Sequence, residues 1–267
     1  MADTATVAQL QVGRKSRRTF DRRWVLVPAT FVVVIVAWDL AVRIFSLPSY
    51  LFPSPLAVWD SLSNMVVRQR FWENVGVTVS EAIGGYVIGV VAAVVLGVLI
   101  SEWKFLQQTI YPYVIALNAV PKTALAPLFV AWLGFGPESK LLTAALVALF
   151  PVLVNVIEGL RASNPAQIEL IRVADGSNWQ IFRYVKVPNA LPFFFAGLEI
   201  AIVMALTGAV VAEWVGAKSG LGQQMLQYIY EFNIAGMFAV LVVVSLLGFF
   251  LDLAVRIAQR RIVFWVE

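Results

Sequence analysis

Long apolar runs, rather than an alternation of buried and exposed positions, are the main feature of this sequence. No charged residue interrupts residues 82–101, between Glu81 and Glu102, or residues 232–251, which end before Asp252. A helix of about 20 apolar residues crosses the hydrocarbon core of a bilayer, and each large aliphatic side chain favours insertion by about 0.3 to 0.6 kcal/mol. The pattern therefore predicts membrane-spanning helices.

Six such spans are expected, so the predicted fold class is an all-α integral membrane protein with six transmembrane helices. They are predicted at residues 24–45, 75–101, 106–134, 138–160, 189–216 and 234–258. The first run is interpreted as an uncleaved span because Arg43 and Pro48, rather than a small-residue cleavage site, follow it. Residues 46–74 are expected outside the membrane, with an interfacial helix over 56–70 that Pro55 begins.

Basic residues set the expected orientation. Six Lys and Arg residues lie in the amino tail (1–23), one at Lys104, four in the loop 161–188 and three at the carboxyl end. The carboxyl tail is predicted at 261–267. The opposite side of the membrane has Arg43, Arg68, Arg70, Lys140 and Lys218. Since cytoplasmic loops carry the excess of basic residues, both termini and the loop 161–188 are predicted to be cytoplasmic. The transmembrane core is predicted at 75–260 and contains this loop.

The composition excludes several functional classes. Of the 267 residues, 60% are hydrophobic and 13% charged, which is more apolar surface than a soluble domain of this length can bury. The chain has no cysteine and no histidine, which removes disulfides, thiolate metal sites and the commonest general base. We therefore expect no catalytic residue, metal or cofactor in this chain. The net charge of +4 follows from the basic loops and requires no nucleic-acid partner.

A stripe of small residues at intervals of four marks the second span. Gly85, Gly89, Ala93 and Gly97 share one helix face, where they let another helix approach closely. Two interpretations stay open: static close packing, or a face along which a neighbouring helix slides or rotates.

The loop 161–188 carries two helix start signals. Asn164 before Pro165 is typical of an N-cap with proline at the first helical position, and Ser177 with Gln180 has the spacing of a capping box. Asp175-Gly176 between them is a helix break. The loop is therefore predicted to form two short helices, at 165–174 and 178–186.

Each predicted loop helix has an apolar face. Ile168 and Ile171 share a face of the first helix, and Trp179, Phe182 and Val185 recur at near-helical spacing on the second. Either these side chains pack beneath the protein's own spans, or they bind a partner.

The run from Glu169 to Pro188 resembles the EAA loop of bacterial ABC-importer permeases, in which Glu-Ala-Ala is followed by a glycine and later by a proline. Its first and last residues occupy the expected places. Leu170 and Ile171 replace the two alanines, and Asp175 stands where the glycine is expected, with Gly176 one residue later. The departure predicts a bend that is tilted or differently closed.

Three further segments are similar to the nitrate, sulfonate and taurine branch of the binding-protein-dependent permeases: 51–59, 120–136 and 211–222. The resemblance implies a type I ABC-importer permease fold with a coupling-helix loop, in the bacterial inner membrane. It also implies a homodimer, two ATP-binding cassette ATPase subunits that hold ATP and Mg, and an extracytoplasmic substrate-binding protein. The sequence has no G-x-x-x-x-G-K-[ST] motif, so ATP hydrolysis is expected in a separate subunit.

The residues expected to couple this chain to the ATPase lie in the EAA-like loop. Trp179 and Phe182 are predicted apolar anchors, and Glu169, Arg172 and Arg183 are predicted polar contacts. The predicted bend between them consists of Asp175 and Gly176.

Lys122 is the main candidate for the translocation pathway, because ionisable residues within spans are functional candidates by default. It either faces the pathway and attracts an anion, or pairs with a carboxylate and supports a broken helix. The candidate partners are Glu158, Glu199 and Glu213. The other predicted pathway residues, on the fifth span, are Met204, Thr207, Val211 and Glu213.

The expected solute is a nitrate-, sulfonate- or taurine-type anion. The alternative is a neutral heteroaromatic, such as a thiamine-precursor pyrimidine or riboflavin, because segments 208–213 and 237–239 look slightly closer to pyrimidine-type members. An ion-coupled secondary transporter is the alternative of another class; it would show inverted repeats, and none is evident.

Overall fold

The computed structural model describes residues 23–265, and side chains from residue 26 onward. Most of the predicted amino tail therefore lies outside the described residues. The chain divides into two units, Met1–Leu47 and Pro48–Glu267, which are described separately.

In the first unit the described residues form one long helix, α1 (Arg23–Ile44). Its range agrees with the predicted span at 24–45, and residues Leu26–Ile44 are long and apolar enough to cross a membrane. Arg43 forms an ion pair with Asp39 one turn earlier, at 2.7 Å, which is the favourable spacing on a helix.

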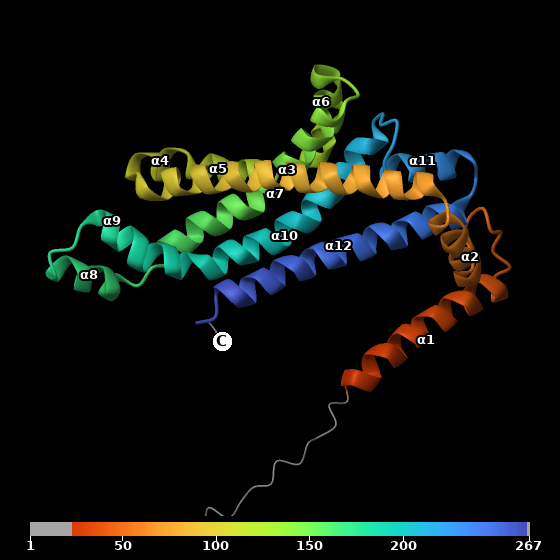
Figure 1. Cartoon of the computed structure of the whole chain (residues 1–267), viewed down its shortest axis with the longest axis horizontal. Helices are drawn as coiled ribbons and strands as arrows, with labels where there is room; N and C mark the ends of the chain where they lie inside the picture. The colour runs from red at the N-terminus through yellow and green to blue at the C-terminus, as the bar shows by residue number, and fades with distance from the viewer. Residues whose placement is uncertain (1–22, 266–267) are drawn as a thin grey trace, which may run out of the picture. The chain divides into compact units, whose positions relative to one another are not determined.

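In the second unit, helices joined by short turns make up the regular secondary structure of the described residues. Its elements are α2 (Pro55–Val66), α3 (Gln69–Glu102), α4 (Lys104–Thr109), α5 (Tyr111–Asn118), the 3₁₀ helix η1 (Lys122–Leu125), α6 (Ala126–Leu133), α7 (Pro137–Arg161), α8 (Pro165–Val173), α9 (Asn178–Ile181), the π-helical turn η2 (Phe182–Lys186), α10 (Val187–Trp214), α11 (Leu221–Tyr230) and α12 (Ile234–Ile262). The long helices α3, α7, α10 and α12 run alongside one another, with α8 and α9 at one end and α11 at the other (Figure 1).

Five helices among the described residues are long and apolar enough to cross a membrane, and one bent helix pair makes a sixth if it is counted as a single span. The predicted all-α, six-span fold class is therefore confirmed.

The small-residue stripe of α3 packs against α7. A Cβ atom on Gly89 would lie 2.5 Å from the carbonyl oxygen of Ala145, and one on Gly85 would lie 2.7 Å from that of Leu141. Ala93 is fully buried in the core that α3, α7 and α10 share. The close approach of another helix, which both interpretations of the stripe require, is confirmed.

The helix boundaries before α3 differ from the prediction. The interfacial helix ends at Val66 rather than at 70, and α3 begins at Gln69 rather than at 75. The first turns of α3 are helical because Phe71 and Asn74 are buried there, and Asn74 hydrogen-bonds to α11. Polar side chains at this end hid the helix from a hydropathy pattern.

The predicted third span at 106–134 is not one continuous helix. Its main part bends by 84° between Tyr111–Asn118 and Lys122–Leu133. Pro121 lies at the break, where its missing N–H and fixed φ end the preceding helix. Pro127 then lies in the first turn of α6, a position that helices tolerate.

The loop 161–188 is partly as predicted. Its first helix, Pro165–Val173, agrees with the expected 165–174. The second is not separate, because helix continues from Asn178 through η2 and Pro188 to Trp214. Pro188 does not break it because the wider π turn that precedes it accommodates the missing N–H.

Candidate functional site: the coupling loop and the buried charges

Local hydrogen bonds fix both helix starts of the loop. The side chain of Asn164 accepts a 2.9 Å hydrogen bond from the backbone N–H of Ala166. Ser177 and Gln180 form the reciprocal capping box, in which each side chain accepts from the other's backbone N–H. Both predicted caps are confirmed.

The displaced glycine has a structural explanation. Asp175 adopts the left-handed conformation, with φ of 60°, which Asp tolerates better than most residues. Its N–H bonds to the carbonyl of Arg172, and the N–H of Gly176 bonds to that of Ile171, which is the Schellman pattern. A Cβ on Gly176 would lie 2.8 Å from the Ile171 carbonyl oxygen. The glycine is therefore required by close approach rather than by φ.

The loop exposes four large apolar side chains. We call Leu170, Val173, Trp179 and Tyr184 the loop patch; they are 71%, 82%, 64% and 64% exposed. Sequence reasoning selected the opposite face of α8, because Ile168 and Ile171 had a clear helical spacing. The signal it missed was the pair Leu170 and Val173, three residues apart on the other face.

Phe182 was predicted to be an exposed anchor. In the structure it instead packs against the protein's own core. The ring of Trp179 stacks on it, with centroids 5.7 Å apart. Glu169, Arg172 and Arg183 are exposed, as polar contacts to a partner would have to be. The two interpretations of the aromatic face thus apply to different residues: Phe182 is internal, and Trp179 is available.

An ion pair joins the loop to the end of another long helix. Lys186 donates two hydrogen bonds to the Glu102 carboxylate, at 2.7 and 2.9 Å. Asn189 donates to the side chain of Gln167 in α8 at 3.0 Å. These contacts tie α8 and η2 to α10 and α3.

Lys122 closes the break in the bent helix pair. Its ammonium donates to the backbone carbonyl and the side-chain oxygen of Asn118, at 2.6 and 3.0 Å, and lies 4.5 Å from the ring centroid of Phe150. A cation there satisfies carbonyls that the end of α5 leaves free.

The predicted pairing of Lys122 with a carboxylate is wrong. Glu158 binds Tyr111 and Arg161, Glu199 binds Arg256, and Glu213 binds Thr78. The carbonyls of Asn118 take the place of that carboxylate because they lie within one helical turn.

The predicted pathway residues fall into two groups. Met204 lies beside Lys122 in the wall of a cavity of about 320 Å³. Thr207 is exposed on the same helix, and Val211 is half-buried. Glu213, in contrast, is fully buried and does not line this cavity, and its pathway role stays a prediction.

Glu213 instead caps the start of α11. Its Oε1 accepts a 2.6 Å hydrogen bond from the hydroxyl of Thr78, and its Oε2 accepts from the backbone N–H of Gly222. Thr78 also accepts from the N–H of Leu221 at 2.8 Å, and Asn74 accepts from that of Gly220 at 3.0 Å. A negative charge at a helix N-terminus is favourable, and here it satisfies N–H groups that have no partner within the helix.

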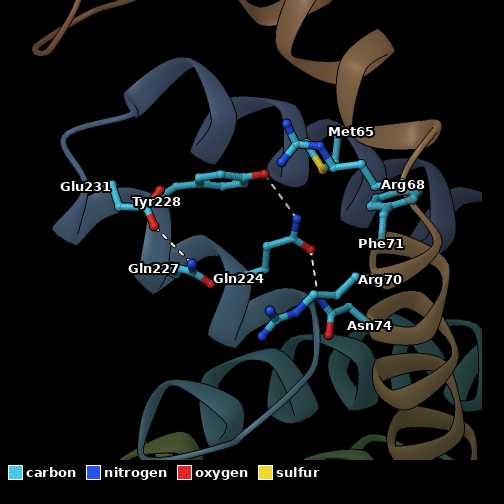
Figure 2. Close-up of a pocket in the computed structure, with 9 residues that line it drawn as sticks. All are labelled: Met65, Arg68, Arg70, Phe71, Asn74, Gln224, Gln227, Tyr228 and Glu231. Atoms are coloured by element: carbon cyan, nitrogen blue, oxygen red, sulfur yellow. Dashed lines mark hydrogen bonds between the residues drawn. The ribbon is translucent and has the colours of Figure 1, made fainter.

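A polar pocket of about 200 Å³ lies along α11. Figure 2 shows Gln224 between Tyr228 and Asn74; it donates to the Tyr228 hydroxyl at 3.2 Å and accepts from Asn74 at 3.0 Å. Arg68 and Arg70 also line the pocket and are exposed. The pocket presents two cationic groups and one carboxylate, that of Glu231, at the α11 end of the long helices.

Two buried charges were missed by the prediction. Lys140, counted from the sequence as an outer charge, is 1% exposed and donates to the carbonyls of Phe135 and Gly136 at 2.6 and 3.0 Å. Glu81, which served only to bound an apolar run, is 6% exposed in α3. Both line a cavity of about 510 Å³. The available signal was a charged residue inside a helical pattern of apolar positions.

Comparisons with known proteins agree on one family. The sequence model described as "Binding-protein-dependent transport system inner membrane component" matches residues 85–264. The riboflavin transport system permease protein of Chloroflexus aurantiacus is 30% identical, over 99% of each chain. The formylaminopyrimidine transport permease protein of Halalkalibacterium halodurans is 32% identical, over 88% of this chain and 93% of the relative. A putative aliphatic sulfonates transport permease protein of Bacillus subtilis is 27% identical, over 90% and 86%.

The fold is similar to that of a solved transporter. A chain of the MetNI methionine ABC transporter, in an inward-facing conformation, superimposes with a TM-score of 0.59 at 24% identity, covering 74% of this chain and 95% of that one. This likeness supports the fold.

Proposed function

Because this chain belongs to the family of binding-protein-dependent transport system inner membrane components, we propose that it imports a small neutral nitrogen heteroaromatic. The chain is the permease subunit of an ABC importer and not an enzyme. In the proposed assembly, two copies form the translocation path and two ATP-binding cassette ATPase subunits hold ATP and Mg. An extracytoplasmic binding protein delivers the solute.

The loop patch is the proposed docking surface for the ATPase. Leu170, Val173, Trp179 and Tyr184 form exposed apolar surface on a loop that its own caps and the Lys186–Glu102 pair hold rigid. Such a patch on an ordered loop is typical of an interaction site, and aromatic side chains are the usual anchors. ATP binding closes the ATPase pair and moves the loop, and α10 carries the motion into the membrane.

The proposed orientation places both termini and the loop 161–188 in the cytoplasm. The distribution of basic residues supports it. The excess of Lys and Arg on the cytoplasmic side is larger than the sequence indicated, because Lys140 is buried and does not count as an outer-loop charge. The segment 46–74 and α11 then lie on the outer side, where the binding protein docks.

The choice of a heteroaromatic solute rests on the relatives. Those whose names state riboflavin and formylaminopyrimidine are 30% and 32% identical, above the sulfonate relative at 27%. A sulfonate-, nitrate- or taurine-type anion is the second candidate. Arg68 and Arg70, in the outer pocket along α11, favour it because guanidinium groups bind oxyanions.

Reconstitution tests the proposal. The permease and its ATPase are purified together and placed in proteoliposomes with the binding protein, which is loaded in turn with a pyrimidine, riboflavin, taurine or an alkyl sulfonate. Stimulation of ATP hydrolysis by a heteroaromatic load alone supports the proposal. Stimulation by the sulfonate alone establishes the second candidate, and a permease that never assembles with an ATPase refutes both.

A further inference from the structure

An apolar groove of about 190 Å³ lies where α3, α7, α10 and the π turn η2 meet. Every residue that lines it is apolar, among them Val98 of α3, Leu160 of α7, Leu191 of α10 and Phe182 of η2. Val98 lies one turn before the end of α3, and Leu160 is the last residue but one of α7. The groove therefore extends to the ends of these helices beside the coupling loop, and its lining suits an apolar occupant.

The groove and the cavity beside Lys122 lie on opposite sides of α7 and α10. On α7, Val156 lines the groove, whereas Val147, nine residues earlier, lines the cavity. On α10, Leu191 lines the groove and Ile200, nine residues later, lines the cavity. Nine residues make about two and a half turns of an α-helix, so the two side chains of each pair point in opposite directions.

The proposed function indicates what covers the groove. It places the translocation path between two copies of the chain, and the predicted pathway residues Lys122 and Met204 lie on the cavity side. The groove is then turned toward the lipid. Trp103, which is 61% exposed directly after α3, is the kind of aromatic side chain that marks the headgroup level of a bilayer. The groove thus lies just inside the headgroups of the leaflet on the loop side.

The loop end of the groove has an excess of positive charge. Lys186, next to Val187 in the groove lining, is paired with Glu102, one turn beyond Val98. Its ammonium bonds to both Glu102 oxygens, and its third N–H has no partner among the described residues. The other charged residues at the ends of α3 and α7, at the start of α4 and in η2 are Lys104, Glu158, Arg161 and Arg183. Four cations thus stand against two carboxylates, and basic clusters at the cytoplasmic ends of membrane helices bind anionic headgroups.

We propose that the groove binds one acyl chain of an anionic phospholipid, whose phosphate is held by Lys104 and by the third N–H of Lys186. Phe182 and Lys186 both belong to η2, which joins the coupling loop to α10. An occupied groove therefore supports the joint between the ATPase-docking loop and the membrane helices, and transport depends on the anionic lipid content of the membrane. The inference rests on the proposed function, because it takes the Lys122 side as the side of the path.

Lipid retention by the permease–ATPase complex tests the site. The complex is extracted from vesicles that contain equal amounts of radiolabelled phosphatidylglycerol and phosphatidylcholine with the same acyl chains, and the lipid that stays bound after washing in detergent is counted. The wild type should retain phosphatidylglycerol about fivefold or more in preference to phosphatidylcholine, because one contact between a basic residue and an anionic headgroup corresponds to a factor of about five. Lys104→Gln should lower that preference by about fivefold.

Two further variants separate the groove from general surface charge. Leu191→Trp fills the groove and should lower the retention of both lipids, with the unfolding midpoint measured alongside. Arg261→Gln removes an exposed cation from α12, none of whose described residues lines the groove, and should keep the wild-type preference. In nanodiscs, ATP hydrolysis stimulated by the heteroaromatic-loaded binding protein should rise with the phosphatidylglycerol fraction, and Lys104→Gln should require a higher fraction.

Equal retention of the two lipids by the wild type, or no retention, overturns the inference. An equal loss of preference in Lys104→Gln and Arg261→Gln overturns it too, because surface charge alone then explains the preference. Since the chain has no cysteine, Leu191→Cys provides a single thiol, and a disulfide between two copies would show that the second copy covers the groove instead. A wild type that couples normally to the loaded binding protein but shows no lipid preference refutes the groove and leaves the proposed function standing.

Discussion

The hydroxyl of Thr78 donates a 2.6 Å hydrogen bond to the carboxylate of Glu213, and both residues are fully buried. The same hydroxyl accepts the backbone N–H of Leu221. One side chain of α3 thus holds both the carboxylate that caps α11 and the first turn of α11 itself. Removing it leaves two buried polar groups without a partner.

Thr78→Val keeps the shape of the side chain and removes these bonds. Each group left unsatisfied costs about 1 to 3 kcal/mol, so we expect a thermal unfolding midpoint several degrees lower in detergent. Thr109→Val is the matched control, because the exposed Thr109 hydroxyl only donates to the carbonyl of Phe105 one turn earlier. Equal midpoints for the two variants would show that the cap does not stabilise the fold.

Substitutions at Trp179 and Phe182 should have different effects, the first on ATPase docking and the second on the stability of the fold. Trp179→Ala removes an exposed side chain, so we expect a normal unfolding midpoint but weaker ATPase association and ATP hydrolysis that no longer drives uptake. Phe182→Ala opens a gap in the core and should lose about 2 kcal/mol of stability. Trp59→Ala, at a tryptophan 65% exposed in α2, controls for loss of an exposed indole. Full coupling in Trp179→Ala would reject the docking surface.

The family pattern implies that the bend requires glycine at position 175, whereas the structure requires it at position 176. Asp175→Gly restores glycine at the usual position and relieves a left-handed residue, so stability should stay within about 1 kcal/mol of the wild type. Gly176→Ala drives a methyl group against Ile171 and should reduce coupled transport strongly. The measurement is uptake per ATP hydrolysed in proteoliposomes; a harmless Gly176→Ala would contradict the assigned geometry.

Local signals in the sequence predicted local structure well. The caps at Asn164 and Ser177 depend on residues two or three positions away, so their spacing alone identifies them. Lys140 and Glu81 could not be placed in this way, because their burial results from the packing of helices far apart in the sequence. A charge near the end of an apolar run has the same pattern whether it faces water or a neighbouring helix.

The third span was mispredicted for a related reason. Hydropathy is continuous across Pro121 although the backbone turns by 84° there, and only the proline signals the break. What stabilises the bend is Lys122, whose partners on Asn118 are created by the bend itself. The residue was identified from the sequence, but its partners were not.

Lys122→Met tests whether that lysine supports the bend or lines the pathway. Loss of charged hydrogen bonds to Asn118 should cost about 1.5 to 3 kcal/mol, and Lys122→Arg should recover most of it because the cation remains. If the role of Lys122 is structural, the solute concentration that gives half-maximal uptake should not change once uptake is normalised to the amount of folded permease. An increase in that concentration without a change in the unfolding midpoint would assign Lys122 to the pathway.

The Lys186–Glu102 pair should transmit motion rather than merely stabilise the fold. The two side chains are 23% and 31% exposed, and their charged atoms lie 2.7 Å apart, so the pair should contribute at most about 1 kcal/mol to stability. Because it joins η2 to the end of α3, Glu102→Lys should lower uptake per ATP hydrolysed far more than it lowers the unfolding midpoint.

The charge-swapped double variant, Glu102→Lys with Lys186→Glu, restores an ion pair of the opposite polarity and should recover most of the coupling. Asp39 and Arg43, an ion pair within α1 at 2.7 Å, provide the control swap, which should leave coupling unchanged because both residues lie on one helix. If the double swap at 102 and 186 transports no better than either single variant, the side chains matter for their identity and not for the ion pair. If both single variants couple normally, the loop drives α3 through the backbone of α10 alone.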